Sequence, residues 1–104
     1  MFTRKTALKQ ANNFIDDLKK FGLSPTRAVL FGSIAKGKQH ALSDIDLAVW
    51  EPSFTGALGI DYERIMPVLR PYMMLELHTF NGEDTAENNP FVNEIIKTGI
   101  ELTV

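Results

Sequence analysis

The sequence contains no cysteine, which excludes disulfide bonds and metal sites built on thiolates. It also has no apolar stretch that approaches the roughly 20 residues needed to cross a bilayer. The first residues, Met1 to Lys5, lack the apolar run of a secretory signal. We therefore expect a cytoplasmic protein with no membrane partner. The net charge of −2 argues against tight, sequence-independent binding to nucleic acid, which requires a basic face.

The 104 residues are enough for one domain, and we predict that residues 1–104 form a single one. The core of a domain this small is thin. A partner protein or a second copy of the chain could therefore cover exposed apolar surface.

Hydrophobic periodicity predicts an alternation of helices and strands that makes an α/β fold. We expect a mixed sheet of about four strands with helices packed mainly on one face. Phe21 and Phe91 should face the core, and Pro67 should kink its helix or split it into two short turns. The predicted elements are a helix ending before Gly22, a strand over 28–31, a short helix or turn over 34–39, a strand over 44–50, a helix near 61–69, a strand over 73–80, a helix over 90–97 and an edge strand over 100–104.

Gly32 and Ser33 follow the first predicted strand and precede the predicted short helix. A glycine lets the chain turn tightly and lets a ligand approach the backbone, and a helix N-terminus favours an anion. A phosphate oxygen would suit this position. The same dipeptide is also common in ordinary turns, so on its own it indicates a ligand only weakly.

Asp44 and Asp46 lie two residues apart at the start of the next predicted strand, so their side chains should point the same way. Two adjacent carboxylates repel each other, and a divalent cation such as Mg²⁺ or Mn²⁺ removes that repulsion. The alternative is a hydrated strand end with two aspartates placed there by chance. Ten residues separate Ser33 from Asp44, which brings both motifs to the ends of strands that we expect to be neighbours.

These two motifs together resemble the signature of the DNA polymerase beta-like nucleotidyltransferase superfamily, whose minimal (MNT) members are stand-alone domains of about this length. The resemblance is specific over residues 28–50. It is carried by FGSIAKG at residues 31–37 and SDIDLAV at residues 43–49. It implies that Gly32 and Ser33 bind the phosphates of ATP or another nucleoside triphosphate. Lys36 stands where many members carry arginine, and it would neutralise the leaving pyrophosphate without the bidentate contact that arginine makes.

The resemblance also implies a third carboxylate on a neighbouring strand, and Glu76 is the best candidate. Strand alternation places Glu76 on the face opposite Leu75 and Leu77, where it can face the aspartate pair. Many members have aspartate there, and glutamate is one methylene longer. The alternative is an exposed edge glutamate. His78 shares that face, either as a packing or hydrogen-bonding residue or as a contributor to substrate binding or proton transfer.

Membership would imply two-metal nucleotidyl transfer, with Asp44, Asp46 and Glu76 as the catalytic and metal-binding residues. Small MNT proteins often pair with a helical HEPN protein as an antitoxin, and some transfer AMP to a tyrosine of that partner. We expect the same setting here. The contrasting hypothesis is a non-catalytic nucleotide-binding or regulatory module on the same fold, because a fold alone never establishes activity.

Overall fold

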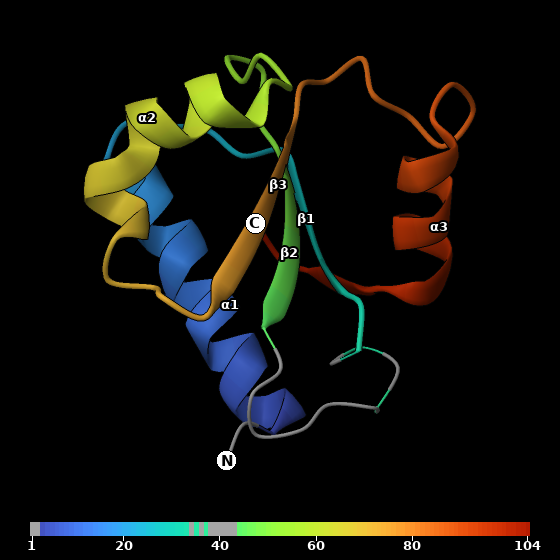
Figure 1. Cartoon of the computed structure of the whole chain (residues 1–104), viewed down its shortest axis with the longest axis horizontal. Coiled ribbons are helices and arrows are strands. Elements are labelled where there is room, and N and C mark those ends of the chain that lie inside the picture. The colour runs from blue at the N-terminus through green and yellow to red at the C-terminus, as the bar shows by residue number, and fades with distance from the viewer. Residues whose placement is uncertain (1–2, 34, 36, 38–43) are drawn as a thin grey trace.

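The computed structural model describes residues 3–33, 35, 37 and 44–104 of the chain. Helices and strands are interspersed along it, with two strands in succession before the second helix (Figure 1). The predicted short helix or turn over 34–39 lies outside the described residues, apart from Ala35 and Gly37. The elements are α1 (Arg4–Lys20), β1 (Arg27–Phe31), β2 (Ile45–Trp50), α2 (Leu58–Leu69), β3 (Leu75–Phe80), α3 (Pro90–Thr98) and β4 (Ile100–Leu102).

Within the described residues, four strands form one mixed sheet in the order β3-β2-β1-β4. β1 pairs antiparallel with both β2 and β4, whereas β2 and β3 are parallel and α2 connects them. β4 is an edge strand, as the alternation of its residues predicted. The α/β fold with a mixed four-stranded sheet is therefore confirmed.

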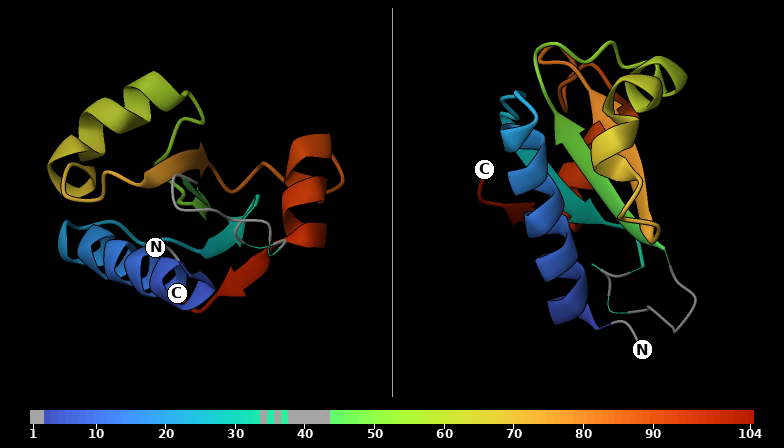
Figure 2. Two further views of the ribbon diagram at one scale, coloured as in Figure 1. Left: turned by 60° about the horizontal axis from the view of Figure 1, so that its bottom comes forward. Right: turned by 90° about the vertical axis from the view of Figure 1, so that its left-hand side faces the viewer.

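The helices cover both faces of this sheet. α1 and α2 lie on one face and α3 lies on the other (Figures 1 and 2). The larger core, on the first face, contains Ile45, Leu47 and Val49 of β2, and the smaller core, under α3, contains Ala48 and Trp50. Alternation along β2 thus turns Asp46 toward the face that carries α3.

Phe21 and Pro67 differ from their predicted roles. Phe21 is 47% exposed, because α1 ends at Lys20 and the chain turns away before Phe21 reaches the core. Pro67 lies inside a single continuous helix rather than between two short turns. It occupies the last turn of α2, where a missing N–H removes only one backbone hydrogen bond near a helix end.

A buried aspartate inside α2 holds the loop that leads into this helix. The N-cap residue, Ala57, has no side chain that could accept a hydrogen bond. Asp61, 1% exposed, instead accepts hydrogen bonds from the backbone N–H groups of Thr55 and Gly56 at 2.9 and 3.0 Å. It also accepts from the hydroxyl groups of Thr55 and Thr79 at 3.1 and 2.7 Å, which ties α2 to β3.

Tyr62, the next residue of α2, contacts the outer edge of β3. Its hydroxyl group donates a hydrogen bond to the backbone oxygen of Leu77 and accepts one from the backbone N–H of Leu77, both at 3.0 Å. α2 therefore occupies the backbone groups at the middle of this edge strand.

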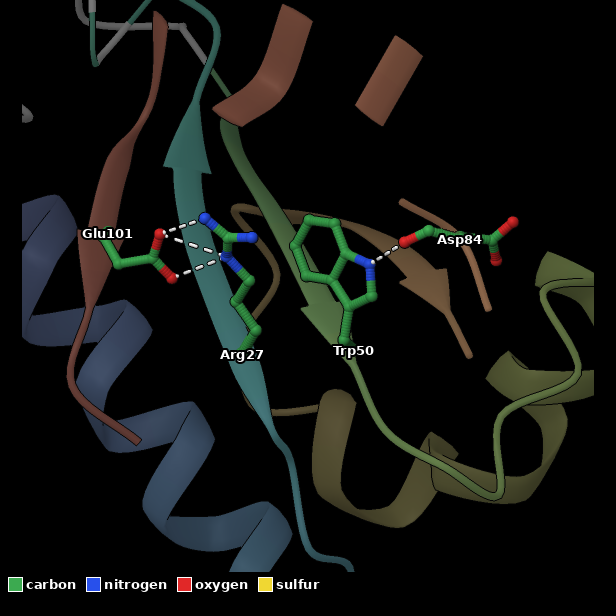
Figure 3. A network of polar contacts seen from close by, with 4 residues as sticks. All are labelled: Arg27, Trp50, Asp84 and Glu101. Carbon is green, nitrogen blue, oxygen red and sulfur yellow. Dashed lines mark hydrogen bonds and ion pairs between the residues drawn. The ribbon is translucent and has the colours of Figure 1, made fainter. Parts of the chain in front are cut away.

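A polar network at the end of the sheet where β1 begins and β2 ends fixes the segment that leads into α3 (Figure 3). The indole N–H of Trp50 donates to the backbone oxygen of Asp84 at 2.8 Å. Arg27 lies 5.7 Å from the Trp50 ring and pairs with Glu101 of β4 at 2.7 Å. These contacts join β1, β2, β4 and the loop before α3, and so position α3 over the sheet. None of the helices among the described residues combines the length and the hydrophobicity that a membrane-spanning helix needs.

Candidate functional site

The turn after β1 and the start of β2 meet at one end of the sheet. β1 ends at Phe31, whose partner across the antiparallel pair is Asp46. Gly32 follows with φ of +75°, in the left-handed region that favours glycine. A Cβ atom at Gly32 would overlap Oδ2 of Asp46 and lie 3.0 Å from its Cγ. The carboxylate of Asp46 is thus packed directly against the backbone of the Gly32 turn.

Replacing Gly32 with alanine should destabilise the protein by about 2 kcal/mol, because it adds both a left-handed backbone cost and a clash with Asp46. Gly22→Ala is the matched control, since Gly22 has φ of +105° and open space around its Cβ position. Chemical denaturation measures the loss of unfolding free energy in each variant. The difference between the two losses is the contribution of the clash, since Gly22→Ala has only the backbone cost. Equal losses of unfolding free energy would contradict the close approach of Asp46.

Asp46 and Glu76 are direct partners across the parallel pair of β2 and β3. Leu75 and Leu77, the neighbours of Glu76, are buried in the larger core, so the pleat turns Glu76 to the same face as Asp46. Loss of hydration and the neighbouring negative charge of Asp46 raise the pKa of Glu76. Two carboxylates held side by side in this way favour a positively charged ligand.

His78 lies two residues beyond Glu76 on the same face of β3. Its Nε2 atom is 3.9 Å from Oδ1 of Asp46. Its ring packs edge-to-face against both Phe31 and Phe91, at centroid distances of 5.1 and 5.6 Å, and these two rings also contact each other. The two phenyl rings restrict the orientation of the imidazole.

The prediction that Phe91 faces the core is wrong, because this side chain is 46% exposed. Val92 and Ile95 fill the smaller core instead. Phe91 is the second residue of α3, after the N-cap Asn89, and lies at the rim beside Phe31 and His78. Helical periodicity groups Phe91 with the apolar residues but gives no signal that it lies beside a polar site.

Asp46, Glu76 and His78 together offer a donor set that fits a divalent cation. One ligand atom from each lies within 4.8 Å of the other two. The set contains hard carboxylate oxygens and one imidazole nitrogen, both common ligands of divalent ions. Asp44, the exposed residue before β2, lies outside this group of three, yet its charge contributes to the raised pKa of Glu76.

Two of the three predicted phosphate-binding residues lie within the described part of the structure. Gly32 and Ser33 form the turn after β1, beside Asp46, whereas Lys36 lies outside the described residues. The first residue of α1, Arg4, donates a hydrogen bond to the backbone oxygen of Ala35 at 2.9 Å. This contact joins the N-terminal helix to the segment after the turn. The two residues are 31 positions apart in the sequence, and no sequence pattern predicted their contact.

Comparison with known proteins shows which family and which solved structure the chain is similar to. A family model described as a nucleotidyltransferase domain matches residues 9–99. A crystal structure of a toxin-antitoxin with AMP-PNP has a TM-score of 0.65 and 21% sequence identity, over 89% of this chain and 72% of that chain. At that identity the likeness shows a common fold. No curated protein matches the chain.

Proposed function

The chain belongs to the nucleotidyltransferase domain family, and from this premise we propose that it transfers AMP from ATP to a hydroxyl group of a protein partner. The observation that carries the proposal is the meeting of Asp46 with both the Gly32 turn and Glu76 at one end of the sheet. A triphosphate-binding turn and a carboxylate pair that can hold a cation are the two parts this reaction needs.

Each residue of the site has its own role in the proposed reaction. Asp44, Asp46 and Glu76 would hold Mg²⁺ or Mn²⁺. When bound, such a cation neutralises phosphate charge and polarises the phosphorus–oxygen bond. The backbone N–H of Gly32 and the hydroxyl of Ser33 would donate hydrogen bonds to the β- and γ-phosphates. Lys36 would neutralise the leaving pyrophosphate.

In the proposed reaction, the acceptor oxygen forms a bond to the α-phosphorus as the bond from that phosphorus to the bridging oxygen breaks. Pyrophosphate leaves with that bonding electron pair. Glu76 would accept the proton of the attacking hydroxyl, since it is the most exposed of the three clustered side chains and is open to an incoming group.

We further propose that the acceptor is a tyrosine of a helical HEPN-type toxin, which makes this chain an antitoxin. The MNT-like motifs at residues 31–37 and 43–49 support this setting. The toxin-antitoxin structure that holds AMP-PNP on the same fold supports it as well.

The test uses ATP labelled at the α- or the γ-phosphorus. Each is incubated with Mg²⁺, the chain and a HEPN-type protein from the same source, and mass spectrometry follows the partner. We expect α-label and the mass of one adenylyl group on a tyrosine, with no γ-label. Transfer of γ-label would indicate a kinase. Binding of ATP without transfer of either label would indicate the non-catalytic binding module and overturn the proposal.

A further inference from the structure

His78 lies at the proposed site, but the transfer reaction outlined above gives it no task. Its Nε2 atom is 3.9 Å from Oδ1 of Asp46, beyond the reach of a hydrogen bond. Nε2 nevertheless lies beside the carboxylate of Asp46, and the rings of Phe31 and Phe91, which also contact each other, pack against the imidazole. A nitrogen held near two carboxylates without a hydrogen bond to them has the arrangement of a metal ligand.

The sheet leaves room for this arrangement. His78 is paired across the sheet with Ala48, the buried residue two positions beyond Asp46. Because the side chain of Ala48 is a single methyl group, nothing larger on β2 separates the imidazole from the carboxylate of Asp46. Glu76 completes the group from the same face of β3.

The three ligand atoms lie close to the spacing that one octahedral ion requires. Ligand atoms at bonds of about 2.1 Å lie about 3 Å apart when adjacent and about 4.2 Å apart when opposite. The 3.9 Å between Nε2 of His78 and Oδ1 of Asp46 falls within that interval, and all three atoms lie within 4.8 Å of one another. Small side-chain rotations would bring them to coordination distance.

We infer that Nε2 of His78 binds the divalent cation together with Asp46 and Glu76, so that the site takes Mn²⁺ in preference to Mg²⁺. Carboxylate oxygens alone suit Mg²⁺, which dehydrates reluctantly and is seldom bound by imidazole. A nitrogen ligand favours first-row transition ions. The inference rests on the proposed function only for the presence of a cation, and it concerns binding in the absence of nucleotide and partner.

The test is electron paramagnetic resonance of Mn²⁺ bound to the nucleotide-free protein. In the wild-type chain we expect spin-echo modulation from an imidazole ¹⁴N, replaced by the ¹⁵N pattern when histidine is supplied with that isotope. This isotope exchange needs no substitution, so it is independent of any effect on folding. A wild-type protein that binds no Mn²⁺, or binds it without nitrogen modulation, would overturn the inference.

Two variants assign the nitrogen, since the chain has only two histidines, His40 and His78. His78→Gln should lose the modulation and lower the ratio of Mn²⁺ to Mg²⁺ affinity by at least about tenfold. His40→Gln is the matched control and should retain both. Modulation that persists in His78→Gln would refute the assignment. If label is transferred to the partner but no nitrogen modulation is seen, this inference is wrong and the proposed function stands. If nitrogen modulation is seen but no label is transferred, the proposed function is wrong and this inference stands.

Discussion

Replacing Asp46 with asparagine is expected to lower nucleotidyl transfer by about 100- to 1000-fold. Asp46 is central to the candidate site, since it is the partner of Glu76 across the sheet and contacts the Gly32 turn. Its loss removes a charged cation ligand, and a catalytic cation contributes several kcal/mol of transition-state stabilisation, each 1.4 kcal/mol being tenfold in rate. Rates of α-label transfer at saturating ATP measure the effect.

The same substitution should stabilise the metal-free protein. The ligand oxygens of Asp46 and Glu76 lie within 4.8 Å of each other, and two negative charges at that distance repel by about 1 kcal/mol in water. Asparagine keeps the shape of aspartate and removes that repulsion. We therefore expect a melting temperature several degrees higher in a chelating buffer, together with weaker Mn²⁺ binding in calorimetry.

Asp16→Asn is the matched control for this prediction. Asp16 is exposed on α1 and carries the same charge, so its replacement should leave transfer and Mn²⁺ affinity unchanged. If Asp46→Asn retained wild-type transfer, Asp46 would have no part in the reaction. If it melted at a lower temperature than the wild type in chelator, the close carboxylate pair would be wrong.

Replacing Asp61 with alanine is expected to destabilise the protein by about 3 kcal/mol. Asp61 is buried and accepts four hydrogen bonds from Thr55, Gly56 and Thr79. Alanine would leave those donors without their acceptor, and the cost is largest for the Thr79 hydroxyl group, whose hydrogen bond is buried. In a chain of this length the melting temperature should fall by more than about 10 °C. Glu63→Ala, at an exposed position of the same helix, should change it little.

The contribution of Asp61 should depend on pH. Burial raises the pKa of this carboxyl group, but the hydrogen bonds from Thr55, Thr79 and Gly56 lower it and prevail, so that the folded-state pKa is below its ordinary value. The unfolded state then binds more protons than the folded state as the solution is acidified. The stabilisation is fully present above the unfolded-state pKa of about 3.9 and is lost as pH falls through the folded-state pKa.

Urea unfolding of the wild type and Asp61→Ala at a series of pH values measures this dependence. The difference in unfolding free energy should be constant from about pH 5 to 8 and should shrink below about pH 4. A difference that is unchanged down to pH 2 would show that the ionised carboxylate is not what stabilises the start of α2.

Local sequence pattern was enough to place the strands and to assign the side chains of β2 and β3 to their faces of the sheet. Ile45, Leu47 and Val49 alternate with polar or small residues, which identifies β2 and turns Asp46 away from the larger core. The same alternation turns Glu76 to the face of Asp46. The pairing of these two residues then depends on the parallel register of β2 and β3.

The features that were not predicted depend on contacts between distant parts of the chain. Helical periodicity cannot tell that α3 covers the face opposite α1 and α2, so it gave no reason to place Phe91 at the rim beside His78. The loop that leads into α2 is held by Asp61, inside the helix, while the N-cap position holds alanine. No rule for helix ends identifies such a residue from sequence.

The contact of Tyr62 with β3 bears on how this protein can associate with others. An open strand edge offers free N–H and C=O groups to which another chain can add a strand, in specific complexes and in aggregates alike. At the middle of β3 both backbone groups of Leu77 are already bonded to the Tyr62 hydroxyl. A partner that approaches this edge therefore meets α2 first, and recognition there has to proceed through helix side chains.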